Sequence, residues 1–454
     1  MKVTVVGCGK IGTAIINRLV SEGHDIIAVD KSKAVVQTVT NIYDVMCVTG
    51  SGTDQETLID AGAGECDMFI SVTDSDETNM LSCFMAKKMG AKHTVSRIRS
   101  PEINDKSLSF IKQHMDISLV INPELLAAKE IFNILKLPSA VNIETFSRRN
   151  FEMIELVIKP GSKLDGVTLV ELRKKYSGKF LICAVGRGDE VYIPGGDFKL
   201  MAGDKIGLTA ETSEIEKLLK QLDIMQKRAR NIIILGAGRV SEYLSRMLVG
   251  GGNNVKAIDL DAKKCEKLAK SVPEVTVING DGSEQEVLLE EGIGNVDAFI
   301  TLTGMDEQNI LISYFASTLS VPKVVTKVNR QELYNIAERL GLDTLISPKH
   351  IIEDVVSRYA RALQNSINSS NIETLYRLLD EKVEAVEFKV GKDFEYINVP
   401  IKEIKTAKNA IIAGIIRNRR QIIIPSGDDY ILEGDKVVII STNKNILNLN
   451  DIIE

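Results

Sequence analysis

The chain contains the same module twice, and the second copy begins 229 residues after the first. The first copy reads Val-Thr-Val-Val-Gly-Cys-Gly-Lys-Ile-Gly over 3–12 and reaches an acid at Asp30. The second reads Ile-Ile-Ile-Leu-Gly-Ala-Gly-Arg-Val-Ser over 232–241 and reaches Asp259. In both copies the acid follows the first glycine by 23 residues. One glycine fingerprint is a weak signal, but two in register predict a duplicated nucleotide-binding fold.

The register of the repeat persists well past the glycines. At an offset of 230, a polar segment returns with its key residues unchanged: Thr73, Asp76, Glu77 and Asn79 recur as Thr303, Asp306, Glu307 and Asn309. Near the end of each copy the offset is 231, where Pro194 and Gly203-Asp204 return as Pro425 and Gly434-Asp435. The whole chain is therefore two copies of one long unit.

Short apolar runs bounded by glycine or acid predict the strands of each half. In the first half they cover 2–6, 25–30, 45–49, 68–73 and 92–98, and in the second 231–235, 254–259, 275–279, 298–303 and 323–328. Helical patterns fill the gaps of the first half over 10–22, 34–42, 55–62 and 78–89. Continuous apolar strands alternating with helices predict an α/β fold with a Rossmann-like, doubly wound parallel sheet in each half.

A different pattern follows each sheet. Asn122-Pro123 and Ser347-Pro348 predict the starts of crossover helices. Alternating apolar residues and Gly-Asp turns then predict a small β-rich domain, and the charged stretch 217–230 is interpreted as a helical end and a linker. The predicted boundaries are 1–120, 121–150 and 151–222 for the sheet, crossover helices and small domain of the first half, 223–230 for the linker, and 231–346, 347–382 and 383–454 for the second half.

Composition narrows the class of protein. The net charge is −6, from 56 basic and 62 acidic residues, which argues against a nucleic-acid partner. The six cysteines show no Cys-x-x-Cys spacing, and the chain begins with a strand pattern in place of a signal sequence. The apolar run over 410–416 is far shorter than the ~20 residues of a membrane-spanning helix. We therefore expect a cytoplasmic protein whose membrane role, if any, is peripheral.

The fingerprint residues define the chemistry of the first site. Gly7 permits a tight turn between strand and helix, Gly9 lets backbone amides approach a phosphate, and Gly12 allows close helix packing. A phosphate is then stabilised at the helix N-terminus. Asp30 is expected to accept both ribose hydroxyls, which favours NAD(H) or an adenine nucleotide over NADP, although the neighbouring Lys31 weakens that preference.

The second site departs from this pattern at Ser241, which replaces the third glycine and predicts looser helix packing or altered phosphate geometry. Cations occur at matching positions of the two halves. Lys10 and Arg239 lie between the second and third fingerprint positions, and Arg97 and Lys327 end the fifth strands. Matched cations at the carboxyl edges of the sheets predict a ligand that carries a polyphosphate.

Catalytic residues are hard to find. None of the four histidines recurs between the halves, and no Ser-His-Asp set or metal-ligand spacing occurs. The favoured hypothesis is therefore a nucleotide sensor and not an enzyme. The alternative is a soluble NAD-dependent oxidoreductase, which would need a proton donor beside a nicotinamide. Oxidation of NADH by a panel of ketoacids would identify that alternative.

The order of sheet, crossover helices and small β domain resembles a known family. Together with Gly7–Gly12, Asp30, Thr73-Asp74 and the segment 97–102, it resembles the Trk potassium-uptake regulatory (TrkA) family, in which each half is one RCK (KTN) unit. The resemblance covers essentially the whole chain. It implies a cytosolic protein on the inner face of the membrane that forms a homotetrameric ring. Such a protein gates a TrkH-like potassium-translocating subunit according to bound NAD(H), ATP or ADP.

The resemblance also implies the residues that contact the nucleotides. In the first half they are Gly7, Cys8, Gly9, Lys10, Ile11, Gly12, Asp30, Lys31, Ser51, Thr53, Thr73, Asp74 and Arg97. In the second half they are Gly236, Ala237, Gly238, Arg239, Val240, Asp259, Asp281, Thr303 and Lys327. Gly304 and Lys327 stand where Asp74 and Arg97 stand, which implies a different nucleotide preference. Related units hold a divalent cation through an interfacial acid, and Glu124 is the matching candidate here.

Overall fold

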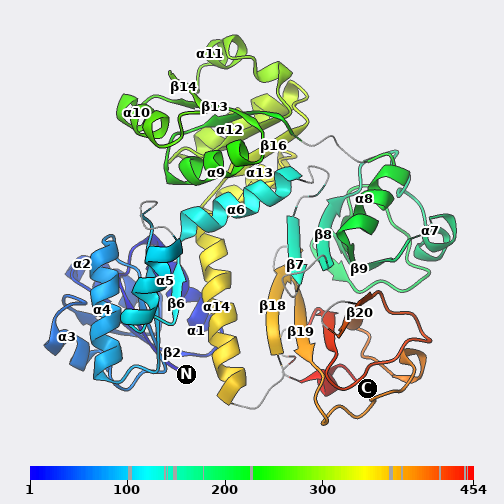
Figure 1. The fold of residues 1–454 in the computed structure, drawn as a ribbon, viewed down its shortest axis with the longest axis horizontal. Helices are drawn as coiled ribbons and strands as arrows, with labels where there is room; N and C mark the ends of the chain where they lie inside the picture. The colour runs from blue at the N-terminus through cyan, green and yellow to red at the C-terminus, as the bar shows by residue number, and fades with distance from the viewer. Residues whose placement is uncertain are drawn as a thin grey trace. The chain divides into compact units, whose positions relative to one another are not determined.

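The computed structural model describes residues 1–100, 105–136, 140, 142–146, 151–176, 178–224, 229–367, 372–379, 382–418, 421–443, 446 and 448–453. These residues form two compact units, and each unit combines a part of both halves of the sequence. Unit 1 contains 1–132 and 231–360, and unit 2 contains 133–230 and 361–454. Figure 1 shows the elements along the chain.

The first sheet of unit 1 is parallel, with the strand order β3-β2-β1-β4-β5-β6. This order reverses direction between β1 and β4, which places a ligand crevice at their carboxyl ends. The strands are β1 (Lys2–Val6), β2 (Asp25–Asp30), β3 (Met46–Thr49), β4 (Met68–Ser71), β5 (His93–Arg97) and β6 (Leu119–Ile121). The connecting helices are α1 (Lys10–Ser21), α2 (Lys33–Ile42), α3 (Gln55–Asp60), α4 (Asp76–Met89) and α5 (Asp105–His114).

The second sheet of unit 1 repeats this topology in the order β14-β13-β12-β15-β16-β17. Its strands are β12 (Asn231–Leu235), β13 (Asn254–Asp259), β14 (Thr276–Asn279), β15 (Ala298–Thr301), β16 (Lys323–Lys327) and β17 (Leu345–Ile346). Its helices are α9 (Arg239–Gly250), α10 (Ala262–Ser271), α11 (Gln285–Glu290), α12 (Asp306–Thr318) and α13 (Gln331–Arg339), with a short 3-10 turn at Ile293–Asn295. The predicted pair of doubly wound sheets is confirmed.

Each sheet is stabilised by apolar side chains that the helices cover. In the first half Val6, Val29 and Phe69 of the strands pack with Leu58 of α3 and Cys83 of α4. In the second half the corresponding core joins residues of β12, β13 and β15 to α11 and α12: Ile233, Leu235, Ile258, Phe299, Leu288 and Ile312. Burial on both faces explains why the strands are continuous apolar runs in the sequence.

The predicted crossover segments each begin with one helix. Helix α6 (Pro123–Lys136) is capped by Asn122, whose Oδ1 accepts from the backbone N–H of Leu125 at 2.9 Å. Helix α14 (Pro348–Ile367) is capped by Ser347, whose Oγ accepts from the N–H of His350 at 3.3 Å. The Asn-Pro and Ser-Pro pairs therefore mark helix starts, as predicted, with proline at the first helical position.

Within unit 1, these two helices contact the opposite half of the chain. Ser357 of α14 donates from Oγ to Oε1 of Glu22, after α1, at 2.6 Å. Nη2 of Arg18 lies 3.7 Å from Oδ1 of Asp354. In the other direction, Asn122 at the start of α6 donates to the hydroxyl of Tyr243 on α9 at 3.0 Å. The two Rossmann-like sheets are thus joined by reciprocal helix contacts.

Unit 2 contains two mainly antiparallel sheets, in the orders β10-β9-β11-β8-β7 and β18-β19-β22-β20-β21. The first is built from β7 (Asn142–Phe146), β8 (Phe151–Val157), β9 (Phe180–Arg187), β10 (Glu190–Tyr192) and β11 (Lys205–Glu211), with α7 (Leu169–Lys175) and α8 (Thr212–Gln221). The second is built from β18 (Ile372–Leu378), β19 (Val383–Lys389), β20 (Ala410–Arg417), β21 (Gln421–Ile423) and β22 (Lys436–Ser441), with 3-10 turns at Ile401–Glu403 and Leu449–Ile452.

The two sheets of unit 2 share one apolar core. Phe151 and Met153 of β8 pack with Ala413 of β20 and Val438 of β22. A Cβ added at Gly414 would lie 2.3 Å from the Phe151 ring, so a side chain at this crossing would require the buried ring to shift. The two small domains therefore pack against each other through a close contact.

The structure differs from the sequence interpretation in two places. Strands β7 and β18 lie in segments that were predicted as crossover helices, and each pairs with the first long strand of its small domain. Residues 217–221, interpreted as a charged helical end, belong to α8, whose Leu218 and Leu219 are buried in the core of the small domain. Charged residues on the exposed face of α8 conceal this apolar side in the sequence. The predicted linker residues 225–228 lie outside the described residues.

No helix in the described part of the chain is both long enough and apolar enough to cross a membrane.

Candidate nucleotide-binding site

The glycine loop of the first half is shaped by backbone contacts. Gly7 has a φ of 93°, in the left-handed region, and its N–H donates to the Val29 carbonyl at 2.8 Å. A Cβ at Gly12 would lie 1.8 Å from the Gly7 carbonyl oxygen, so glycine is required for α1 to approach the loop. A Cβ at Gly9 would meet no atom within 4 Å. The loop is thus tightly packed beneath α1 and open at the position predicted to face a phosphate.

The acid at the end of β2 is held in place by the loop. Oδ2 of Asp30 accepts from the N–H of Cys8 at 2.8 Å, and Oδ1 accepts from the N–H of Ser32 at 2.9 Å. In the second half, Asp259 accepts in the same way from the N–H groups of Ala237 and Asp261, at 2.7 and 2.8 Å. Each carboxylate is therefore fixed beside its glycine loop before a ligand binds.

A buried cation lies at the end of β5. The Arg97 side chain is only 7% exposed, and its Nη2 lies 3.5 Å from Oδ1 of Asp74. Burial lowers the pKa of the Arg97 guanidinium, and the nearby Arg99 cation lowers it further. Nε of Arg97 is buried without a hydrogen-bond partner among the described residues. Arg97 is thus a desolvated cation that an added anion would stabilise.

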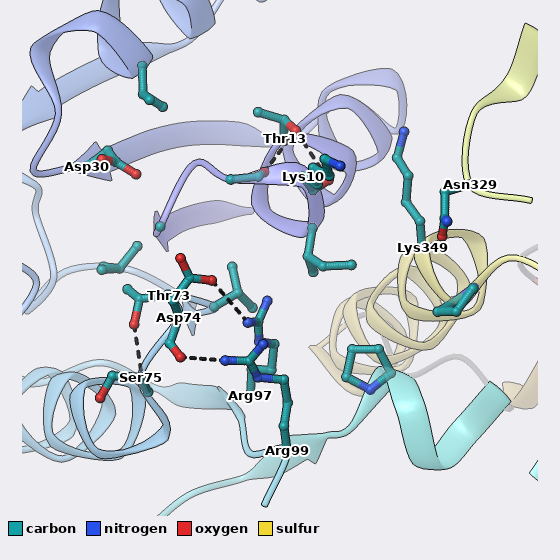
Figure 2. A pocket seen from close by; sticks show the side chains of 18 of the residues that line it. Lys10, Thr13, Asp30, Thr73, Asp74, Ser75, Arg97, Arg99, Asn329 and Lys349 are labelled. Atoms are coloured by element: carbon teal, nitrogen blue, oxygen red, sulfur yellow. Dashed lines mark hydrogen bonds and ion pairs between the residues drawn. The ribbon is translucent and has the colours of Figure 1, made fainter. Parts of the chain in front are cut away.

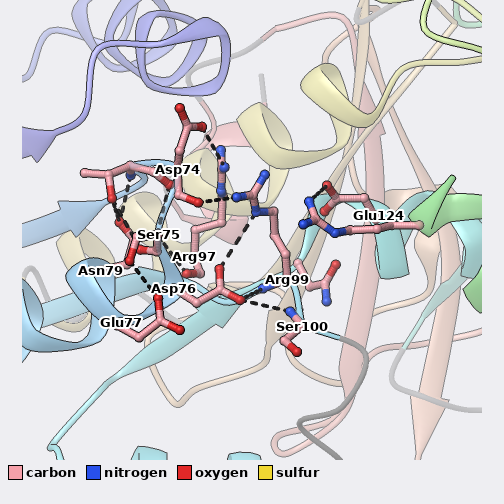
Figure 3. A network of polar contacts seen from close by, with 12 residues as sticks. Asp74, Ser75, Asp76, Glu77, Asn79, Arg97, Arg99, Ser100 and Glu124 are labelled. Atoms are coloured by element: carbon pink, nitrogen blue, oxygen red, sulfur yellow. Dashed lines mark hydrogen bonds and ion pairs between the residues drawn. The ribbon is translucent and has the colours of Figure 1, made fainter. Parts of the chain in front are cut away.

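A polar network fixes the loop that carries Asp74 (Figure 3). The guanidinium of Arg99 donates to the Asp74 carbonyl, and Oδ2 of Asp76 accepts from the backbone N–H groups of Arg99 and Ser100 at 2.9 Å each. In the second half, Asp306 accepts in the same way from the N–H groups of Asn329 and Arg330. This network ties the loop after β4 to the end of β5.

Asn79 lies at the centre of the same loop. Its Oδ1 accepts from the N–H and the hydroxyl of Thr73, both at 2.7 Å, and from the hydroxyl of Ser71 at 3.1 Å. Its Nδ2 donates to the carbonyls of Thr73 and Arg97, at 3.1 and 3.0 Å. Asn309 makes the matching contacts with Thr303 and Lys327. The buried side-chain amide of Asn79 therefore positions Thr73 and Arg97, one on each side of the predicted phosphate site.

A cavity of about 1580 Å³ opens at the carboxyl edge of the first sheet (Figure 2). It is lined by most of the contacts predicted for the first half, which are Gly7, Gly9, Lys10, Ile11, Asp30, Lys31, Ser51, Thr53, Thr73, Asp74 and Arg97. Cys8 in the loop and Gly12 in α1 are outside this lining, because both are buried. The structure therefore brings the predicted first site together around one opening.

Residues of the second half line part of the same cavity. Val240 and Lys327 are the predicted contacts among these second-half residues. Glu124, on α6 of the first half, lines the cavity as well. The other predicted contacts of the second half are outside this lining: Gly236, Ala237, Gly238, Arg239, Asp259, Asp281 and Thr303. They surround the second glycine loop, where Oδ1 of Asp281 accepts from the N–H and hydroxyl of Ser283 at 2.9 and 2.7 Å.

Sequence reasoning missed several polar residues of this cavity, among them three cations and an asparagine. Arg99, Asn329, Arg330 and Lys349 all line it, and Figure 2 shows Asn329 and Lys349 facing it from the second half. The repeat could have identified Arg99 and Asn329, because these two residues are 230 positions apart and therefore occupy matching places in the two halves. Nothing in the sequence places α14, and hence Lys349, beside the first glycine loop.

The second site differs from the first at the predicted positions. Ser241 is fully buried, and its hydroxyl lacks a hydrogen-bond partner among the described residues. Nζ of Lys327 donates to the Leu302 carbonyl at 3.2 Å, and Gly304 supplies no carboxylate to pair with it. Burial lowers the pKa of Lys327, although the nearby acids Asp306 and Glu124 oppose this effect. The second cation is thus desolvated, and position 304 offers it no carboxylate of the kind that Asp74 offers to Arg97.

The candidate metal ligand Glu124 lies among cations. Its Oε1 is 4.0 Å from Nη1 of Arg239, and its Oε2 is buried without a hydrogen-bond partner among the described residues. Within the described ranges, no group of three or more His, Cys, Asp or Glu side chains is arranged to hold a metal ion. The contacts of Glu124 are therefore those of a counter-charge to Arg239.

Comparison with protein-family models matches both halves of the chain. The TrkA-N domain model matches residues 3–123 and 232–348, and the TrkA-C domain model matches residues 153–223 and 385–454. These four matches follow the order of sheet and small domain seen in the structure.

Full-length relatives agree with the family models. The chain is 31% identical over 453 residues to the Trk system potassium uptake protein TrkA homolog of Archaeoglobus fulgidus, with all of both chains covered. It is 28% identical over 463 residues to the Trk system potassium uptake protein TrkA of Haemophilus influenzae, covering 100% of this chain and 99% of that protein.

Solved structures show the same fold. The GsuK RCK domain matches with a TM-score of 0.64 and 17% identity, covering 98% of this chain and 92% of that one. The GsuK channel bound to NAD matches with a TM-score of 0.62 and 18% identity, covering 98% and 77%. GsuK bound to ADP matches with a TM-score of 0.51 and 14% identity, covering 80% and 69%. With two TrkA-N and two TrkA-C domains in tandem, the chain belongs to the TrkA family of Trk potassium-uptake proteins.

Proposed function

We propose that this chain is a nucleotide-sensing regulatory subunit that gates a membrane potassium-uptake transporter. In this proposal each half binds an adenine nucleotide, either NAD(H) or ATP/ADP, at the carboxyl edge of its Rossmann-like sheet. The protein lies on the cytoplasmic face of the membrane against a TrkH-like translocating subunit. Membership of the TrkA family supports the potassium-uptake role, and the two sites in the structure support the sensing role.

One observation carries the proposal. In both halves, a carboxylate at the end of the second strand is fixed by the N–H of the residue after the first glycine, at 2.8 Å for Asp30 and 2.7 Å for Asp259. The same arrangement has survived in two copies that differ at most other positions. A fixed carboxylate beside an open glycine loop is suited to bind ribose hydroxyls while the helix N-terminus binds phosphate. The GsuK structures with NAD and with ADP show both ligand types on a related fold.

The structure also supports self-association, as the proposed ring requires. Leu81 on α4 and Leu311 on α12 occupy matching positions and are 45% and 66% exposed. Phe110 on α5 and Ile336 on α13 are exposed in the neighbouring helices of each half. Large apolar side chains exposed on equivalent faces favour association through those faces. We propose that a second copy of the chain covers them and that repetition closes a tetramer.

We expect light scattering to report about 200 kDa for the purified protein, since four copies of 49.9 kDa give 199.6 kDa. The double variant Leu81→Asp with Leu311→Asp should reduce this mass, because a charge would be buried at each contact. Leu289→Asp is the matched control, since Leu289 is 53% exposed on α11, a helix that carries none of the four apolar residues proposed to lie in the contact. A strictly monomeric protein at tens of micromolar would contradict the ring.

Gating is tested by potassium flux through a reconstituted TrkH-type transporter. Adding this protein should change the flux, and exchanging ATP for ADP should change it again, because a ligand shifts a two-state assembly only through its different affinity for the two states. The control is the Asp30→Ala, Asp259→Ala double variant, which should respond little to the exchange. Flux that is indifferent to the protein and to both nucleotides would refute the regulatory role.

The two sites should prefer different nucleotides. Asp74 adds an exposed negative charge beside Arg97, whereas Gly304 leaves Lys327 without one. The second site should therefore accept more phosphate charge and favour ATP or ADP. In the full chain, Asp74→Gly should strengthen ATP binding at the first site about two- to fivefold, the effect of one exposed charge pair. Glu77→Gln, an exposed acid outside the cavity lining, is the control. Calorimetry that gives identical NADH and ATP rankings for Asp30→Ala and Asp259→Ala would contradict the difference.

A further inference from the structure

A tyrosine of the second half is bonded to the wall of the first site. Tyr243 lies on α9, and its hydroxyl donates to the Arg99 carbonyl at 3.1 Å. The same hydroxyl accepts from Nδ2 of Asn122, the residue that caps α6, at 3.0 Å. Burial raises the pKa of Tyr243, so the hydroxyl stays protonated and remains a donor at neutral pH. A single hydroxyl thus joins α9 to two elements of the first half.

On one side, this contact leads to the second glycine loop. Helix α9 begins at Arg239, directly after Gly238 of the second fingerprint, and Tyr243 lies about one turn further along. The N-terminal turn of α9 is where the phosphate of a second-site nucleotide would bind. Arg239 in the same turn is 4.0 Å from Glu124 of α6. Tyr243 therefore lies on the helix whose N-terminal turn is the predicted phosphate position of the second site.

On the other side, the contact leads into the first cavity. Arg99 donates through its guanidinium to the Asp74 carbonyl, and Oδ1 of Asp74 lies 3.5 Å from Nη2 of Arg97. All three residues line the cavity, and Figure 3 shows Arg99 and Arg97 both directed toward Asp74. Arg99 and Asp74 thus form the path of contacts from Tyr243 to Arg97, the buried cation of the first site.

This contact is not repeated in the other direction. The position of the first half that matches Tyr243 is Ala14, counted from the first glycine of each fingerprint, and alanine has no hydroxyl. Helix α1 contacts the second half instead through Arg18 and Glu22, near its C-terminal end and away from its glycine loop. Among the described residues, the hydroxyl contact of Tyr243 with the wall of the first site therefore has no counterpart at the matching position of the first half.

We propose that Tyr243 is a positioning residue through which occupancy of the second nucleotide site sets the affinity of the first. The inference rests on the proposed function, because it requires both halves to bind nucleotide. The coupling is a free energy between the two sites, and it can be measured as the change in the affinity of one site when the other is disabled. The test is a double-mutant cycle on the full chain.

The chain has no tryptophan, so a single introduced tryptophan reports on the first site alone. Val35→Trp, in the cavity lining beside Asp30, provides this fluorescence signal for titration with ADP. In this background, disabling the second site with Asp259→Ala should change the first-site Kd by about fivefold or more, the usual lower range of coupling between sites. When Tyr243→Phe is also present, the same disabling substitution should change it by less than about twofold.

Two further variants sharpen the result. Tyr359→Phe is the matched control, because its hydroxyl also bridges the two halves, 3.4 Å from Nδ1 of His93, but at the amino end of β5 away from the cavity. It should keep the coupling of the parent chain. Asn122→Ser keeps an oxygen to cap α6 and removes the amide that donates to Tyr243, so it should reduce the coupling.

The outcomes separate the two proposals. ADP that binds but shows no coupling in the parent chain, or coupling that survives both Tyr243→Phe and Asn122→Ser, would overturn the role of Tyr243 and leave nucleotide sensing intact. A parent chain to which neither ADP nor NADH binds would overturn the proposed function and this inference together. Loss of coupling in Tyr243→Phe with an unchanged first-site Kd at an empty second site would establish the positioning role.

Discussion

Asp30→Ala should weaken ADP and NADH binding at the first site about 5- to 150-fold. The side chain is a charged acceptor for ribose hydroxyls in our proposal, and the loss of such a hydrogen bond inside a site costs about 1–3 kcal/mol. Because the carboxylate is already fixed by the N–H groups of Cys8 and Ser32, the ligand need not order it on binding. Calorimetric titration of the full chain measures the change in Kd.

The control for Asp30 lies on the same strand. Asp25 begins β2 at the opposite edge of the sheet and is exposed, so Asp25→Ala should leave both Kd values unchanged. Asp30→Asn separates charge from shape, since it keeps one oxygen acceptor for the loop and removes the negative charge. It should bind more tightly than Asp30→Ala. A Kd for both ligands that is the same in Asp30→Ala as in the parent chain would remove Asp30 from the site.

The features of the fold that the sequence predicts are those set by local pattern. The apolar runs of β1, β2 and β4 are continuous because helices cover both faces of the sheet, and this burial is visible one strand at a time. The starts of α6 and α14 are likewise local, since proline and its capping neighbour define them. The second copy strengthened each of these predictions by repeating it.

The features that the sequence misses depend on distant packing. Strand β7 is recognisable only through its pairing with β8, and β6 and β17 are too short, at three and two residues, to show a period. The burial of Leu218 and Leu219 on α8 is likewise set by the small-domain core, because the sequence indicates only a charged helical end there. The shared cavity arises because α14 of the second half contacts α1 of the first, and a pattern within either copy carries no information about this contact.

The largest local effect on stability is expected at Asn79. Asn79→Ala removes five hydrogen bonds and leaves the N–H of Thr73 and the carbonyl of Arg97 without their side-chain partner. Because Asn79 is fully buried, water does not replace it. Each buried group left unsatisfied costs about 1–3 kcal/mol, so the loss of partner for these two groups should lower the free energy of opening of this region by about 2–6 kcal/mol. Hydrogen exchange of peptides that cover 68–79 and 93–99 measures that free energy.

Asn309→Ala is the matched control, because Asn309 makes the same contacts between Thr303 and Lys327 in the second half. Each substitution should accelerate exchange mainly in its own half, since the amides it releases belong to its own β4–α4 or β15–α12 loop. If Asn79 also positions the phosphate site, Asn79→Ala should weaken first-site ADP binding beyond any effect of Asn309→Ala, because Asp74 and Arg97 lose their common anchor. Rapid exchange with unchanged ADP affinity would show that Asn79 stabilises the loop without positioning Arg97. Unchanged exchange in both variants would contradict the network itself.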